Sequence, residues 1–236
     1  MKIKQSILAL IITAIAVSCD DGRIYDSSAI TATTGRTLHL TATIKGAGNW
    51  PDGYRLVTAG FNPTSNYALI AKDVMPAADG TVEHTMTQID EEATTVELCI
   101  IDRLRKRIVT YESLDCTGAA TNIEMNLGEL DVSMYPTIQN KIFNTYCIQC
   151  HGGSTYAGAG LYLTTGKSYD ALVNVQSIKS PAGALLVTPG NAEASFLHTA
   201  LNTDISSSWR IDHIDIIQFP ALLTIIDEWI NAGAKK

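Results

Sequence analysis

The segment Thr37-Leu38-His39-Leu40-Thr41-Ala42-Thr43-Ile44 decides the fold of the first half of the chain. Apolar residues occupy every second position from Leu38 onward, which is the period of a strand with one buried face. Turn signals such as Asn62-Pro63 and Ala78-Asp79-Gly80 lie between this segment and its strand-like successors. The successors are residues 54–61, 67–74, 81–89, 94–101, 107–114 and 122–127.

Seven short strands over about a hundred residues predict an all-β, immunoglobulin-like antiparallel sandwich at 31–131. The region contains no catalytic constellation, because His39 and His84 have no Cys or acidic neighbour at metal-ligand spacing. Cys99 and Cys116 fall on neighbouring strands of a protein exposed to an oxidising compartment, which allows a disulfide. The expected pairing register places the two residues out of line, so the disulfide stays an open alternative.

The N-terminus has the features of an export signal. Lys2 and Lys4 precede an apolar run at 7–17, which is too short to span a bilayer. The following Ala16-Val17-Ser18-Cys19 resembles a bacterial lipobox, which implies a lipid on Cys19 and a membrane anchor without a spanning helix. Asp20-Asp21 resembles the start of outer-membrane lipoproteins. The alternative is an ordinary secretory signal with an incidental Cys, and both interpretations place the protein outside the cytoplasm.

The composition excludes one class of partner. Of the 236 residues, 24 are acidic and 17 are Lys or Arg, and the formal net charge is −7. An acidic chain of this kind presents no broad basic surface, so we expect no nucleic-acid partner. Hydrophobic residues make up 46% of the chain, which is enough for a packed core.

The segment Cys147-Ile148-Gln149-Cys150-His151 carries the chemistry. Two thiols at this spacing can add across the two vinyl groups of haem, and the following His can bind the iron. The motif therefore predicts one covalent haem c on Cys147 and Cys150, with His151 as the proximal iron ligand. Zinc is the competing interpretation, but no second Cys pair follows at ribbon spacing. A thioredoxin-like redox pair fits poorly, since the motif lies outside any strand–helix unit.

The residues around this motif resemble class I cytochromes c, in particular the planctomycete-type domains. Ile138, Ile142, Phe143 and Tyr146 recur at helical spacing before the motif. Two further segments match in order, Val187-Thr188-Pro189-Gly190-Asn191-Ala192-Glu193-Ala194-Ser195-Phe196-Leu197 and Trp229-Ile230-Asn231-Ala232-Gly233-Ala234. The resemblance implies an all-α cytochrome c-like domain, with Pro189 and Trp229 in the haem pocket and Phe143 packed on Trp229.

The sixth iron ligand departs from this family, whose domains usually supply a Met before the closing Trp. None of the five Met residues follows position 134. His213 stands at the corresponding place before Trp229, so it is the expected distal ligand. The alternatives are His198, on an expected short helix, and an open sixth position.

Together these patterns predict a multidomain protein. It consists of a signal peptide at 1–18, a tether at 19–30, an immunoglobulin-like β-sandwich at 31–131 and an all-α cytochrome c-like haem domain at 132–236.

The expected function is extracytoplasmic electron transfer by a lipid-anchored monohaem protein of the outer membrane. Paired imidazoles leave a haem at a lower potential than a Met ligand does. No acid–base pair suggests an enzyme, and the sequence does not identify the redox partner protein. The alternatives are a haem enzyme or gas sensor with an open iron site, and a surface assembly lipoprotein with structural haem.

Overall fold

The computed structural model describes residues 35–118, 121–180, 182–205, 209 and 211–236, which belong to one compact unit, Gly35–Lys236. The expected signal peptide at 1–18, the lipidated Cys19 and the tether at 19–30 lie outside the described residues. Within the described ranges, no helix combines the length and the apolar character that a membrane span requires.

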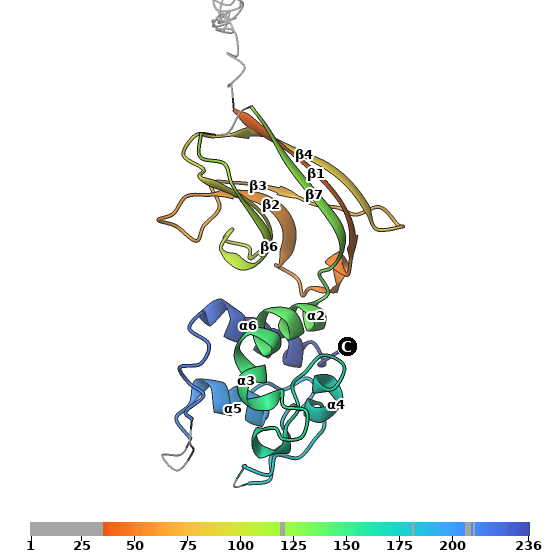
Figure 1. Cartoon of the computed structure of the whole chain (residues 1–236), viewed down its shortest axis with the longest axis vertical. Helices are drawn as coiled ribbons and strands as arrows, with labels where there is room; N and C mark the ends of the chain where they lie inside the picture. Colours follow the sequence, from red (N-terminus) through yellow and green to blue (C-terminus); the bar gives the residue numbers. More distant parts are fainter. Residues whose placement is uncertain (1–34, 119–120, 181, 206–208, 210) are drawn as a thin grey trace, which may run out of the picture. The chain divides into compact units, whose positions relative to one another are not determined.

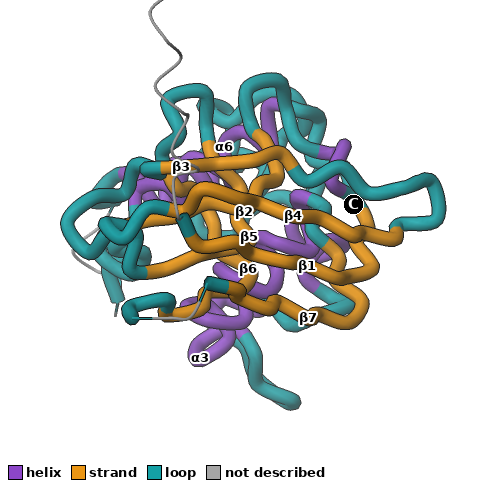
Figure 2. The backbone as a smooth tube through the Cα atoms, turned by 90° about the horizontal axis from the view of Figure 1, so that it is seen from above, coloured by secondary structure: helices purple, strands orange, loops and turns teal. Residues whose placement is uncertain are grey.

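Seven strands, counted over the described part of the chain, form two sheets (Figure 1, Figure 2). One sheet has the order β4-β1-β7 and the other has the order β3-β2-β5-β6. Each segment with the expected strand pattern overlaps one of these strands. The bounds are β1 (Arg36–Lys45), β2 (Arg55–Phe61), β3 (Ile70–Asp73), β4 (Thr81–Ile89), β5 (Thr95–Ile101), β6 (Arg107–Asp115) and β7 (Asn122–Asp131).

The expectation of purely antiparallel pairing is wrong for one strand pair. β1 and β7 run parallel, with Leu38 opposite Ile123 and Leu40 opposite Met125. The period-two pattern tells which face of a strand is buried, but it does not tell in which direction the neighbouring strand runs. Because of the parallel pairing, β1 and β7 finish side by side at Lys45 and Asp131.

The main hydrophobic core lies between the inner faces of the two sheets and includes the fully buried Leu38 and Leu98. A second, smaller cluster that includes Phe61 covers the outer face of the four-stranded sheet. Cys116, directly after β6, belongs to the main core, whereas Cys99 on β5 belongs to the outer cluster. Both are free thiols, so the disulfide that the sequence left open is not formed.

A two-residue connector, Val132 and Ser133, joins β7 to the first helix, and the loop after β1 holds it. The Val132 amide donates to the Lys45 carbonyl at 2.9 Å, and Trp50 Nε1 donates to the Val132 carbonyl at 2.7 Å. Gly46 approaches Ser133 so closely that a Cβ at position 46 would lie 1.9 Å from Ser133 Oγ. With its φ of 77°, position 46 therefore requires glycine.

Short helices and loops make up the rest of the described chain, which Figure 1 follows from green to blue. A π-helix, η2, precedes the short α3 helix, and α6 is the longest helix with 12 residues. The bounds are η1 (Ala47–Asn49), α2 (Met134–Ile138), η2 (Gln139–Cys147), α3 (Ile148–His151), η3 (Gly158–Gly160), α4 (Ser168–Leu172), α5 (Phe196–Asn202) and α6 (Pro220–Asn231).

The expectation of an all-α cytochrome c-like domain after the sandwich is wrong. The described chain contains more strand than helix, and the helices after Ser133 are few and short. Between the motifs the chain forms turns with left-handed glycines, such as Gly166 and Gly183, and isolated β-bridges such as Val173↔Val187. The apolar side chains of these helices also share one hydrophobic cluster with the inner faces of the sheets.

Candidate functional site

The Cys-x-x-Cys-His residues lie where η2 passes into α3. Cys147 ends η2, and Cys150 and His151 belong to α3. Ile142 and Phe143 anchor η2 in the core, with 0% and 1% of their surfaces exposed. Exposure rises along the segment, so Cys147 is partly buried and Cys150 is exposed. The helix end thus presents the motif at the surface, and π-helices often occur at functional sites.

The two thiols are not those of a typical redox pair. Burial raises the pKa of Cys147 to about 12, and the neighbouring Cys150 acts in the same direction. Reactive cysteines of dithiol oxidoreductases have lowered pKa values, since the thiolate is the nucleophile. At neutral pH Cys147 is therefore a thiol, which argues against the thioredoxin-like interpretation.

A backbone carbonyl holds the imidazole of His151. Nδ1 of His151 lies 3.1 Å from the carbonyl oxygen of Leu161, and the Leu163 amide donates to the His151 carbonyl at 2.8 Å. Because a carbonyl only accepts, Nδ1 carries the proton and a neutral ring keeps a lone pair on Nε2. Gly158 allows the close packing around the ring, since a Cβ at that position would lie 3.2 Å from His151 Cε1. A metal-binding histidine is commonly oriented through its second nitrogen in this way.

His213 reaches the same place from a turn before α6. The Ile216 amide donates to the His213 carbonyl at 3.3 Å, which closes the turn. The ring centroids of His151 and His213 lie 6.1 Å apart, and the ring planes make an angle of 45°. Burial lowers the pKa of His213, and the nearby His151 lowers it further, while Asp212 and the Ile211 backbone act in the opposite direction. The structure therefore favours a neutral His213 imidazole beside His151.

The distance between the two rings is the one expected if both bound a single metal atom. Metal–nitrogen bonds to histidine are about 2 Å long, so imidazoles on opposite sides of one metal have ring centres about 6 Å apart. The separation of 6.1 Å agrees with this value. His213 Nδ1 is buried, and the described residues offer it no hydrogen-bond partner. A buried nitrogen without a hydrogen-bond partner destabilises the fold unless a water molecule or an ion satisfies it.

Trp209 is a neighbour of the histidine pair that the sequence analysis missed. Its ring packs edge-to-face on His213, with centroids 5.4 Å apart and planes at 84°. Phe196 of α5 packs in turn on Trp209, with centroids 6.0 Å apart and planes at 68°. The one signal in the sequence was that Trp209 stands four positions before the expected iron ligand His213. A spacing of four residues indicates contact only within a helix, and these residues lie in a loop.

His198, the alternative distal ligand, has a different partner. Its Nδ1 lies 2.8 Å from Oδ1 of Asp227 on α6, and the Asn202 side chain donates to the His198 carbonyl at 2.9 Å. The contact with Asp227 joins α5 to α6, whereas the contact with Asn202 lies within α5. The arrangement agrees with a packing role for His198.

Pro189 lies in a turn that binds the end of α6. The Gly190 amide donates to the Ile230 carbonyl at 2.7 Å, and the Ala192 amide donates to Asn231 Oδ1 at 2.9 Å. The two segments on which the family resemblance rests are thus hydrogen-bonded to each other. The described contacts of this turn are to α6, and they do not join Pro189 to the histidine pair.

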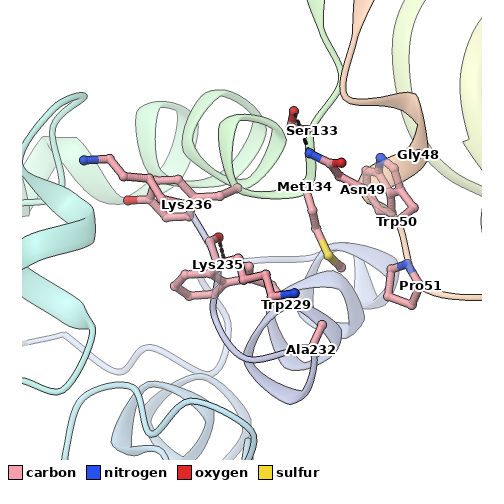
Figure 3. A pocket seen from close by; sticks show the side chains of 11 residues that line it. Gly48, Asn49, Trp50, Pro51, Ser133, Met134, Trp229, Ala232, Lys235 and Lys236 are labelled. Atoms are coloured by element: carbon pink, nitrogen blue, oxygen red, sulfur yellow. Dashed lines mark hydrogen bonds between the residues drawn. The ribbon is translucent and has the colours of Figure 1, made fainter.

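Trp229 lies in a different aromatic group from the histidines. It packs against Tyr135 and Tyr169, with centroid distances of 5.1 and 6.4 Å, and its Nε1 donates to the Lys235 carbonyl at 2.7 Å. Figure 3 shows the ring in the wall of a pocket of ≈ 360 Å³. The loop at 48–51 and the end of the chain also line this pocket, whereas neither the motif nor His213 does.

The described side chains contain no group of three or more His, Cys, Asp or Glu residues placed to hold a metal ion. A scan against protein-family models finds no match to the chain, and a search of curated proteins finds no significant match either.

Proposed function

We propose that Cys147 and Cys150 attach one haem covalently, that His151 and His213 are its axial iron ligands, and that the protein transfers electrons outside the cytoplasm. The observation that carries the proposal is the pair of imidazoles, which come from α3 and from a distant turn and lie 6.1 Å apart between centroids. One of the two directly follows the Cys-x-x-Cys pair.

The chain orients the two histidine rings that would bind the iron. Leu161 fixes the His151 ring through Nδ1, and the turn at 213–216 carries the His213 ring, which lies 6.1 Å from it between centroids. When bound, the haem supplies a one-electron redox couple, and two imidazole ligands favour a lower potential than His and Met together. If His151 and His213 both held the iron, the chain would leave no position for a substrate, which favours an electron carrier over a haem enzyme or gas sensor.

The compartment follows from the sequence. Covalent haem attachment of this type requires export in bacteria, and the lipobox-like segment ending at Cys19 supports a lipid anchor at the outer membrane. The redox partner protein is unassigned.

The proposal is tested on full-length protein produced in a host that matures c-type haem. We expect haem to stay with the polypeptide through acid and solvent extraction, and the reduced protein to be low-spin and slow to bind carbon monoxide. His213→Ala should open the sixth position and give rapid carbon monoxide binding, whereas His198→Ala should not. Wild-type protein that carries no covalent haem, or whose reduced form binds carbon monoxide as readily as His213→Ala, would contradict the proposal.

A further inference from the structure

Two histidines of the candidate site are held in different ways. A carbonyl oxygen 3.1 Å away holds His151 through Nδ1. His213 has a buried Nδ1 without a hydrogen-bond partner of good geometry among the described residues, although the Ile211 backbone lies close enough to act on the pKa of the ring. The perpendicular contact with Trp209 is a close packing interaction that can orient the His213 ring.

The contact continues into the core. Trp209 meets His213 at 84° and Phe196 at 68°, which are both edge-to-face arrangements within the favourable range of centroid distances. Phe196 is the first residue of α5 and is 7% exposed. The row of rings from Phe196 through Trp209 to His213 therefore connects the turn that carries His213 to a buried helix residue.

We propose that Trp209 is a positioning residue that holds the His213 imidazole in its iron-binding orientation. The inference rests on the proposed function, because it assigns Trp209 a role only if His213 binds iron. An edge-to-face aromatic pair shifts an equilibrium by roughly two- to tenfold. Loss of the indole should therefore lower the occupancy of His213 on the iron by a factor of this size.

Carbon monoxide reports this occupancy. It competes with His213 for the sixth position of the reduced iron, so a lower occupancy of His213 raises the apparent affinity for carbon monoxide by the same factor. A purely structural tryptophan would affect unfolding but would leave this competition unchanged.

The experiment compares wild-type holoprotein with Trp209→Ala, Trp209→Phe and Phe219→Ala. Phe219 is the matched control, since it is an aromatic residue before α6 that is 60% exposed. We expect Trp209→Ala to bind carbon monoxide roughly two- to tenfold more tightly and to shift the reduction potential. Trp209→Phe should keep an edge-to-face ring and stay within about twofold of wild type, and Phe219→Ala should equal wild type.

Two supplementary measurements keep the test decisive if Trp209→Ala folds poorly. Phe196→Leu removes the ring behind Trp209 and should raise the carbon monoxide affinity in the same direction by a smaller factor. In haem-free protein, Trp209→Phe should move the NMR resonances of the His213 ring, since the indole lies 5.4 Å from it between centroids.

The wild-type result separates the two proposals. Wild-type protein without covalent haem, or with an open sixth position, overturns the proposed function and the role of Trp209 with it. A six-coordinate wild type whose carbon monoxide affinity and potential do not change in Trp209→Ala overturns the role of Trp209 alone. An equal change in Phe219→Ala has the same meaning, because it would show general loosening of the loop.

Discussion

Arg36 brings a guanidinium group into the edge of the sandwich core, where it meets backbone carbonyls. The group donates to the carbonyl oxygens of Asp90, Ala93 and Cys116, and the distance to Ala93 is 2.6 Å. The residue is 9% exposed, and among the described residues its Nε has no partner. One side chain therefore satisfies three acceptors from the loops after β4 and β6.

We expect Arg36→Met to destabilise the fold, because it removes the donor that the described residues offer to the buried Cys116 carbonyl and one of two donors of the Asp90 and Ala93 carbonyls. A buried unsatisfied acceptor costs about 1–3 kcal/mol, so a loss of about this size in the free energy of unfolding is expected. Urea unfolding followed by circular dichroism measures it. The matched control is Arg55→Met, which breaks the exposed pair with Asp73 and should cost less than about 1 kcal/mol. Equal losses in both variants would show that the carbonyl contacts of Arg36 contribute little.

Some site residues could be found from the sequence and others could not. Cys147, Cys150 and His151 lie within five consecutive residues, so the spacing of the motif alone is enough to propose them. His213 depended on its position relative to Trp229, and the structure does bring it beside His151. Trp209 could not be found, because its contact with His213 depends on the path of a loop and loops have no period that a sequence reveals.

At the scale of elements, His84 connects the two sheets. It lies on β4, and its Nε2 is 2.8 Å from the hydroxyl of Thr58, a fully buried residue on β2. Burial lowers the pKa of His84, and the nearby Lys72 lowers it further. The folded protein thus favours the neutral imidazole more than the unfolded chain does.

This contact gives stability a pH dependence with a defined sign. The unfolded chain takes up the proton near pH 6.5, whereas the folded protein takes it up only at lower pH. The free energy of unfolding should therefore fall as pH drops below about 6.5, until the folded pKa is passed. His84→Gln should flatten this part of the curve in urea unfolding between neutral and mildly acidic pH. An NMR titration that places the His84 pKa above the usual histidine value would contradict the assignment.

The strands were predictable and several other features were not. Alternation marks strands with one buried face such as β1, whereas β2 and β5 are buried on both faces and show instead as short apolar runs between turn signals. The alternation along β7 would be the same whether the strand ran parallel or antiparallel to β1, so it did not predict the parallel pairing. The π-helix also escaped, although Ile138 and Phe143 are five residues apart, which is the spacing of a π-helical turn. The short motifs that resemble cytochromes c also gave no information about the amount of helix in the segments between them.

At the scale of the whole molecule, sheets and helices share one core. The Tyr111 hydroxyl on β6 lies 2.8 Å from Thr137 Oγ1 on α2, and Tyr135 at the start of α2 is 7% exposed. Residues from both regions belong to the same hydrophobic cluster. The candidate site is therefore built on the same packed body as the sandwich.

The anchor is a prediction about the whole protein, and it lies outside the described residues. We expect mature protein to begin at Cys19 and to fractionate with membranes, because two acyl chains hold a protein firmly to a bilayer. Cys19→Ala should release the protein into the soluble extracytoplasmic fraction. Mass spectrometry of the N-terminus and membrane fractionation check both points. Full membrane retention of Cys19→Ala with an unchanged N-terminal mass would refute lipid anchoring.

The two-residue connector, Val132 and Ser133, is held in place by hydrogen bonds, and this affects how the protein could exchange electrons with its partners. Some redox proteins carry their cofactor on a swinging arm that rotates between donor and acceptor. Here the hydrogen bonds from Trp50 and Val132, with Gly46 pressed against Ser133, leave no hinge between β7 and the helix that leads to Cys147. For the electron carrier that we propose, donor and acceptor must therefore each collide with the haem edge in a productive orientation. The rate of exchange would then depend on the encounter of whole proteins, and so on ionic strength and viscosity.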